Sequence, residues 1–217
     1  MPIKNDREYR AMPVLEMKEN RAEQRLDTDY YVEGYATTFN QPYLLWDDGE
    51  VKFYEEIDAR AFDNADVSDV LFLHNHEGKC FARTKMKRGK APTLLLEVDN
   101  VGLFTAADLG TIEEGRQEHN AIINGLVYQM SFAFTVADDE ITKIGEGEYL
   151  RTIKAIRKVY DVSSVDMPAN PFTDISARSA FEGFIESEKQ ELLERQKEAE
   201  AREAQKRKIK ILLEATK

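Results

Sequence analysis

A ten-residue segment, Val127 to Val136, constrains the fold of this chain more than any other stretch. Its residues alternate in character with a period of two, which is typical of a β-strand. One face would carry large, mostly apolar side chains: Tyr128, Met130, Phe132, Phe134 and Val136. The other would carry small or polar ones: Val127, Gln129, Ser131, Ala133 and Thr135. We expect the first face to pack in a core and the second to leave the hydroxyl of Ser131 accessible, as a candidate nucleophile.

Composition narrows the classes of protein to which this chain can belong. It has 217 residues, 42% hydrophobic and 33% charged, which suits one domain with extensions. No stretch approaches the roughly 20 apolar residues that cross a bilayer, and the first ten residues lack an apolar core, so we expect no membrane span and no secretory signal. A single cysteine, Cys80, excludes an internal disulfide and fits a reducing compartment. The net charge of −11 argues against non-specific binding to nucleic acid.

The charge is unevenly distributed along the chain. From Ser179 onward nine acidic and nine basic residues cancel, so the whole net charge lies upstream of that point. A capping box at Ser179 and Glu182 opens a helix that we expect to reach Leu213 and to be mostly solvated. Such a helix either packs the chain against a partner or stands alone in solvent. We therefore predict an N-terminal extension (1–29), a body (30–178) and a charged helical tail (179–217).

Strand patterns dominate the body. Alternating segments are separated by turn sequences such as Asp47 to Glu50 and Asp99 to Gly102. A capping box at Thr111 and Glu114 predicts a helix that runs to Asn124 and is stopped by a left-handed Gly125. We expect the following strands: Arg10 to Met17, Tyr31 to Phe39, Tyr43 to Trp46, Val51 to Ile57, Val70 to His76, a hairpin over Leu94 to Ala106, the Ser131 strand, and Tyr149 to Val165 as one long strand or two. This order of elements indicates an α+β fold built on an antiparallel sheet or a small barrel.

Three histidines are the candidates for a base that would activate Ser131. A serine hydroxyl is a poor nucleophile until a base takes its proton, and imidazole is the usual base near neutral pH. His74 and His76 share one face of the strand expected over Val70 to His76. Asp161 interrupts an otherwise apolar strand, so its carboxylate needs a partner and could orient such a histidine. The alternative is structural: a packed or solvated histidine, and an Asp161 that caps a turn or pairs with Arg157.

Two other types of site use the same histidines. His74, His76, Cys80 and His119 could bind zinc, although their spacing is not that of a closed structural site. The letters His74-Asn75-His76 also match the name of the HNH nucleases. We reject a nuclease because that motif is spread over a larger unit with further metal ligands, and because its domains are usually basic.

Short motifs follow one another in a characteristic order over residues 30 to 175. They are Gly34 to Phe39, Ile57 to Phe62, Leu71 to Glu77, Gly102-Leu103, the helix that ends at Gly125, Met130 to Phe134, and Asp161 to Asn170. In that order and spacing they resemble the prohead maturation proteases of tailed phages, the HK97-type capsid proteases. The resemblance does not extend to the first 29 residues or to the helical tail.

The resemblance implies a serine endopeptidase with an antiparallel β-barrel core like that of the herpesvirus assemblins, carrying a few helices and a long C-terminal helix. It makes Ser131 the nucleophile and His76 the general base. Asp161 matches an acidic position and would be the third member, with His74 as the alternative because assemblins use a second histidine. It implies no metal and no organic cofactor.

The resemblance also implies a biological setting. The enzyme would act inside the procapsid in the host cytoplasm, where it would cleave the scaffolding segment of the major capsid protein and then itself. It would bind neither nucleic acid nor membrane, and a homo-oligomer is compatible with it. The alternative is a catalytically silent assembly or scaffolding protein of the same fold.

Overall fold

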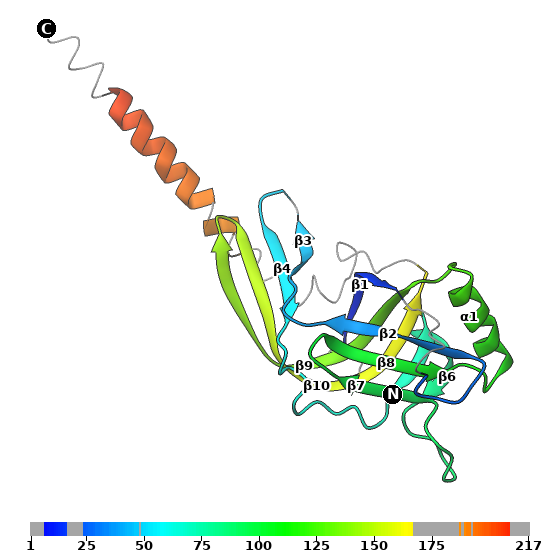
Figure 1. Cartoon of the computed structure of the whole chain (residues 1–217). Helices are drawn as coiled ribbons and strands as arrows, with labels where there is room; N and C mark the ends of the chain where they lie inside the picture. Colours follow the sequence, from blue (N-terminus) through cyan, green and yellow to red (C-terminus); the bar gives the residue numbers. More distant parts are fainter. Residues whose placement is uncertain are drawn as a thin grey trace, which may run out of the picture.

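The computed structural model describes residues 7–16, 24–47, 49–166, 187, 189–191 and 193–208. Within this part of the chain, strands greatly outnumber helices (Figure 1). The elements are β1 (Glu8–Glu16), β2 (Tyr31–Thr38), β3 (Tyr43–Asp47), β4 (Lys52–Ile57), β5 (Leu71–His74), β6 (Glu77–Arg83), β7 (Leu94–Val98), β8 (Gly102–Asp108), α1 (Glu113–Ile123), β9 (Gln129–Gly145) and β10 (Glu148–Val165). The α+β class is confirmed, and Tyr149 to Val165 lies in one strand rather than two.

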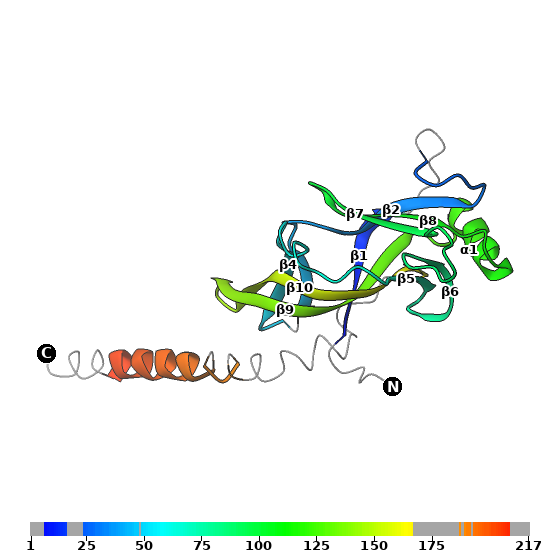
Figure 2. The ribbon, with the colours of Figure 1, turned by 90° about the horizontal axis from the view of Figure 1, so that it is seen from below.

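Two sheets make up the body (Figure 2). The larger has the order β1-β9-β10-β4-β3, with β5 and β6 attached through β10, and the smaller has the order β2-β8-β7. Along one edge β10 pairs antiparallel with β9, and its other edge is shared by β4 and β5, both parallel to it.

The closed antiparallel barrel that we expected is not found in the described residues. The larger sheet ends at two edge strands, β1 and β3, and the parallel pairings of β10 interrupt the antiparallel order. The physical reason is the length of β10: its 18 residues leave room for two short strands along one edge. Those strands arrive by crossover connections, which a pattern of alternating segments cannot reveal.

The core lies between the two sheets and includes the expected apolar face of the Ser131 strand. Met130, Phe132 and Phe134 are fully buried, and the rings of the two phenylalanines stack with centroids 4.4 Å apart. Tyr128 precedes the strand and is half exposed, so its expected place in the core is wrong. The opposite face of this stretch, which includes Ser131, is also buried.

Turn and cap chemistry agree with the sequence at most positions. The hairpins β3–β4 and β7–β8 form as expected, and the carboxylate of Asp99 accepts hydrogen bonds from the backbone N–H groups of Val101 and Gly102. Gly125 follows α1 with a φ of +71°, as predicted. The capping box at Thr111 is not formed: Ile112 is the N-cap of α1, and no side chain caps the helix.

The two ends of the described chain behave differently. Residues expected to form an extension include β1, which pairs with β9 and belongs to the larger sheet. The tail is helical at the described residues 189–191 and 193–208, and it points away from the body in Figure 1. The capping box at Ser179 and the predicted end at Leu213 lie outside the described residues. Where the chain is described, no helix is both long and apolar enough to span a membrane.

Candidate active site

The two longest strands bring a serine and an aspartate together. In the antiparallel β9–β10 pair, Ser131 lies opposite Ser163, and Asp161 lies opposite Ala133 two residues along. Ser131 and Ser163 are fully buried, and Asp161 is 3% exposed. Both strands are anchored by core residues, so these polar groups lie on a rigid part of the sheet.

A tight turn holds His76 next to the paired strands β9 and β10. Our prediction that His76 lies on a strand is wrong. β5 ends at His74, which pairs with Glu77 of β6 and leaves Asn75 and His76 as a two-residue loop. Their φ values of 49° and 61° are the left-handed pair of a type I′ hairpin turn. A non-glycine residue with positive φ needs support from its surroundings.

Asn75 gives the turn that support. Its backbone N–H donates to the carbonyl of Ser164 (2.9 Å), and its side-chain amide donates to the carboxylate of Asp166 (3.0 Å). The backbone N–H of Asp166 donates in return to the Asn75 side-chain oxygen (3.2 Å). The turn is thereby fastened to the end of β10, which fixes where the His76 ring can lie.

An unbroken line of hydrogen bonds joins the three predicted site residues. The Nδ1 of His76 lies 2.6 Å from Oδ1 of Asp161, and its Nε2 lies 2.6 Å from Oγ of Ser131. Ser163 donates a further hydrogen bond to the same Asp161 oxygen (2.9 Å). This is the arrangement in which a carboxylate orients an imidazole and the imidazole can accept a hydroxyl proton. The part played by Ser163 could not be seen in the sequence, where it is one of two adjacent serines.

Comparison with known proteins shows the family of this chain. A family model described as caudovirus prohead serine protease matches residues 15–186. The chain belongs to this family. It is also 30% identical over 156 residues to the prohead protease of Enterobacteria phage HK97, a match that covers 70% of this chain and 61% of the relative, so the chain spans less than two thirds of that protein's length. No solved structure matches the chain significantly.

The other histidines of this prohead protease family member lie elsewhere. The ring of His74 lies between two carboxylates, with Nδ1 3.2 Å from Glu118 and Nε2 3.2 Å from Asp166. The structure therefore does not bring His74 to His76 as a third member. His119 is buried in α1 with its ring edge-on to Tyr30.

The residues weighed for zinc do not form a metal centre in the described structure. Across the described ranges, no group of three or more His, Cys, Asp or Glu side chains is placed to hold a metal ion. The thiol of Cys80 instead contacts the carbonyl of Ala82, and burial raises its pKa. A protonated thiol is a poor metal ligand, which agrees with that placement.

Strand β1 covers Ser131, so our prediction of an accessible hydroxyl is wrong for this structure. Ala11 lies opposite Ser131 in the β1–β9 pair, and the Ser131 hydroxyl is 2.9 Å from the carbonyl oxygen of Arg10. The ring of Tyr9 packs edge-on against that of His76, with centroids 4.7 Å apart. The strand lies almost wholly before the region that the family model matches, which begins at residue 15.

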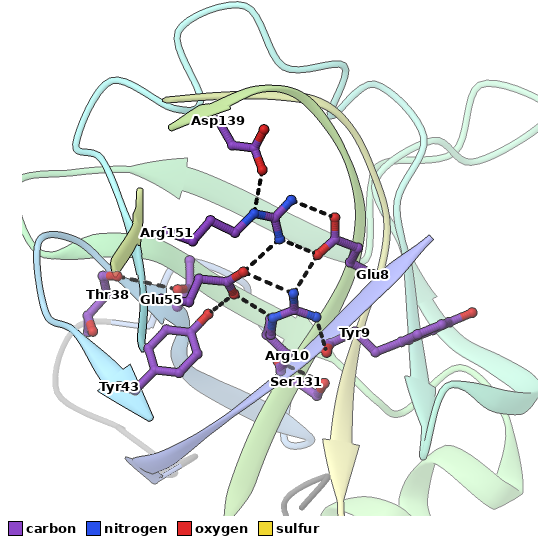
Figure 3. A network of polar contacts seen from close by, with 10 residues as sticks. Glu8, Tyr9, Arg10, Thr38, Tyr43, Glu55, Ser131, Asp139 and Arg151 are labelled. Atoms are coloured by element: carbon purple, nitrogen blue, oxygen red, sulfur yellow. Dashed lines mark hydrogen bonds and ion pairs between the residues drawn. The ribbon is translucent and has the colours of Figure 1, made fainter. Parts of the chain in front are cut away.

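A buried ionic cluster, also missed from the sequence, lies beside Ser131 (Figure 3). We call it the Glu55 cluster. Its members outside β1 are Tyr43 of β3, Glu55 of β4, Asp139 of β9 and Arg151 of β10. Glu55 is fully buried, and Arg151 is 4% exposed. A signal was present in the sequence: Glu55 falls on the same strand face as Phe53 and Ile57, where a lone charge requires a partner.

The ionisation of the Glu55 cluster follows from its charges. Burial would raise the pKa of Glu55, but the guanidinium groups of Arg10 and Arg151 outweigh it and hold that pKa below its usual value. Burial raises the pKa of Tyr43, and the adjacent charge of Glu55 raises it further, so Tyr43 stays a neutral donor to Glu55. Glu55 is therefore ionised at neutral pH and is the central anion of the cluster.

Proposed function

We propose that this chain is a serine endopeptidase in which Ser131 is the nucleophile, His76 the general base and Asp161 the group that orients the imidazole. The observation that carries the proposal is the line from Asp161 through His76 to Ser131, with both contacts at 2.6 Å. Membership of a family described as prohead serine proteases supports a serine as the nucleophile.

The chemistry follows from these contacts. As the Ser131 oxygen attacks a peptide carbonyl carbon, the Nε2 of His76 takes the hydroxyl proton and later passes it to the leaving amine. The Asp161 carboxylate stabilises the imidazolium that forms between the two events. Water then hydrolyses the acyl-enzyme, with His76 again as the base. The chain's own side chains and water suffice for these steps, so the proposal includes no metal or organic cofactor.

The substrate is proposed from the family. The relative in phage HK97 is named a prohead protease, which indicates a protein of the prohead as the substrate. We therefore assign the scaffolding segment of the major capsid protein as the substrate, and the chain itself as a second one. The site of action would be the inside of the procapsid in the host cytoplasm.

Co-expression with the capsid protein tests the proposal. The chain would be produced as wild type, as Ser131→Ala and as Ser68→Ala, and both proteins would be followed by intact mass. We expect a discrete truncation with the wild type and with Ser68→Ala, because Ser68 lies on an exposed loop away from the site, and none with Ser131→Ala. Truncation that survives Ser131→Ala would show that another residue is the nucleophile.

One observation favours a second candidate, a silent assembly protein. Ser131 is fully buried beneath β1, so a substrate cannot reach its hydroxyl while that strand is in place. Treatment with diisopropyl fluorophosphate distinguishes the two, because an activated serine is phosphorylated and an inert one is not. A mass increase on the wild type that Ser131→Ala lacks would support the protease, and no increase on either, together with no truncation of the capsid protein, would support the silent protein.

A further inference from the structure

Strand β1 lies against the edge of β9 in the way that a bound peptide extends a sheet. It pairs antiparallel with the nucleophile and the residues that follow it: Ala11 lies opposite Ser131, and Arg10 lies opposite Phe132. Addition of a strand to a sheet edge is a common mode of peptide recognition, in which backbone hydrogen bonds give affinity and side-chain sites give specificity. Because β1 comes from the far end of the sequence, it reaches this edge as a separate segment rather than as part of a hairpin with β9.

The backbone of β1 places one peptide bond at the nucleophile. The hydroxyl of Ser131 is 2.9 Å from the carbonyl oxygen of Arg10 and 2.6 Å from the Nε2 of His76. The carbonyl that a catalytic serine attacks belongs to the residue before the bond that is cut. Here the hydroxyl donates a hydrogen bond to the Arg10 oxygen, so attack requires this carbonyl to turn until its carbon faces the hydroxyl. By this geometry the bond at the site is the one that joins Arg10 to Ala11.

The side chain of Arg10 enters the Glu55 cluster and is 3% exposed (Figure 3). Its Nε lies 2.5 Å from Oε1 of Glu55, and its Nη2 lies 3.0 Å from Oε2 of the same carboxylate. This two-pronged contact matches the planar fork of a guanidinium, which a lysine ammonium cannot reproduce. Glu8, two residues earlier on the same side of β1, binds both Arg10 and Arg151.

The central carboxylate of the Glu55 cluster has one guanidinium from the body, that of Arg151, and receives its second from Arg10. Without β1, the Glu55 cluster contains two carboxylates, Glu55 and Asp139, against one guanidinium, Arg151. β1 brings Glu8 together with Arg10, so among the described residues the excess of one carboxylate stays the same; what β1 changes is that the fully buried Glu55 gains a second guanidinium. A buried anion is costly unless it is paired and hydrogen-bonded, so the cluster favours a cationic side chain that arrives with the peptide.

We infer that the Glu55 cluster is the subsite that selects an arginine immediately before the scissile bond, and that β1 occupies it as the chain's own substrate, with Arg10–Ala11 as a self-cleavage site. The inference rests on the proposed function, since it needs Ser131 to be the nucleophile. It adds a substrate class, an extended segment with arginine at the site and a carboxylate two residues earlier. It also explains why the site is closed in the uncut chain.

The self-cleavage step balances with the groups present. The Ser131 oxygen bonds to the carbonyl carbon of Arg10, the amide bond to Ala11 breaks, and the Ser131 proton passes through His76 to the Ala11 nitrogen. This leaves residues 1–10 as an ester on Ser131 and Ala11 as a new amino terminus. Water then cleaves the ester, which gives Arg10 a free carboxylate and restores the hydroxyl. The cut separates Ala11 and the residues after it from Arg10, the residue that binds the Glu55 cluster. The edge of β9 then becomes open to another segment.

A peptide made from the chain's own residues 5–16, NDREYRAMPVLE, is the direct probe. It would be incubated with the full chain, and the cut bond would be read by mass spectrometry. Three forms are compared: the native peptide, one with Arg10→Ala, and one with Arg7→Ala, which removes the same charge from a residue that stacks on Tyr160 instead of entering the cluster. We expect a cut after Arg10 in the native and Arg7→Ala peptides. Loss of the buried charge pair should lower kcat/KM by at least about 100-fold in the Arg10→Ala peptide.

The enzyme side of the same contact is tested with Glu55→Gln, which keeps the size of the side chain but not its charge. We expect this variant to lose its preference for the native peptide over the Arg10→Ala peptide, while its circular dichroism spectrum matches that of the wild type, which shows that the chain is folded. In the full-length wild type, intact mass should reveal a fragment that begins at Ala11, and chains carrying Arg10→Ala should keep their N-terminus.

The outcomes separate this inference from the proposed function. If Ser131 is labelled and the capsid protein is truncated, but the Arg10→Ala peptide is cut as well as the native one or the cut falls elsewhere, the inference is overturned and the protease stands. If Ser131 is not labelled and neither the peptide nor the capsid protein is cut, the proposed function fails and the inference fails with it.

Discussion

The two ends of the β9–β10 ladder are built from the same pair of strands but differ in what covers them. At one end, residues 129–135 of β9 are all buried, and the candidate active site lies on one of their faces. At the other end, residues 137–144 are exposed, and the ladder projects from the body (Figure 1). Strand pairing alone therefore does not make a site. The site arises where a core on one face, and the His76 turn and β1 on the other, exclude water.

The largest expected effect is on catalysis at the covered end. Replacing Asp161 by Asn keeps its shape but removes the charge that orients and stabilises the His76 imidazolium, so cleavage of the capsid protein should slow by about 10⁴-fold. Initial rates of truncation, followed by intact mass, measure the change. His74→Ala is the matched control, since His74 contacts Glu118 and Asp166 instead of His76. Equal losses in the two variants would contradict the assignment of Asp161 as the third member.

The second prediction concerns the core beneath the site. Phe132 is fully buried and stacks on Phe134, so Phe132→Ala should lower the free energy of unfolding by about 3–5 kcal/mol through lost contacts and a cavity. Urea denaturation monitored by circular dichroism gives this value. A loss below about 1 kcal/mol would mean that the covered end is not packed as described.

The third prediction uses the pH dependence of the Glu55 cluster, which lies between the two ends. The pKa of Glu55 is held below its ordinary value of 4.5, so its charged contacts stabilise the fold above that pH. This contribution is lost as the pH falls from 4.5 through the lower pKa of the folded state. At pH 7 Glu55→Gln should cost about 3 kcal/mol, because it leaves buried guanidinium charge without its carboxylate.

Urea denaturation of the wild type and of Glu55→Gln between pH 3 and 8 checks that window. The difference in unfolding free energy should be constant above about pH 5 and should shrink below pH 4.5. Asp69→Asn is a useful control, since its partner Arg83 is 40% exposed and exposed ion pairs contribute less than about 1 kcal/mol. A difference for Glu55→Gln that does not change with pH would contradict the described charge state.

The smallest effect is expected at the projecting end. Ile144 is 52% exposed on β9, so Ile144→Ser should change the free energy of unfolding by no more than about 0.5 kcal/mol. The same urea titration measures it beside Phe132→Ala on the same strand. A cost comparable with that of Phe132→Ala would show that the projecting end is covered in solution, for example by another protein chain.

Much of the local structure could be predicted because it depends on neighbours in the sequence. Alternation identified the strands around Met130 and Phe134, and turn residues such as Asp99 and Gly125 marked where elements end. The order of short motifs led to the prohead protease family. The same motifs named Asp161, His76 and Ser131, which the structure then brings into one line of hydrogen bonds; their catalytic roles remain to be tested.

Local patterns failed where the outcome depended on distant segments. A period of two assigned His76 to a strand, but the pairing of His74 with Glu77 places it in a left-handed turn. The pattern also placed Phe132 and Ser131 on opposite faces of their strand, yet it could not show that a segment 121 residues away covers the face of Ser131. The prediction of a closed barrel was wrong for a related reason. The strands that pair in parallel with β10 are brought to it by crossover connections, which local alternation does not reveal.

By itself, the sequence determined most of the strands, several of the turns and which chemical groups are available, because those depend on side-chain alternation and backbone preferences over a few residues. Only the tertiary structure decided that β1 pairs with β9, that the Arg10 carbonyl meets Ser131, and that Glu55 and Arg151 share a buried site. The physical reason is that burial of a charge is stable only when its partner is in place. That partner comes from a remote strand, whose arrival depends on the whole fold.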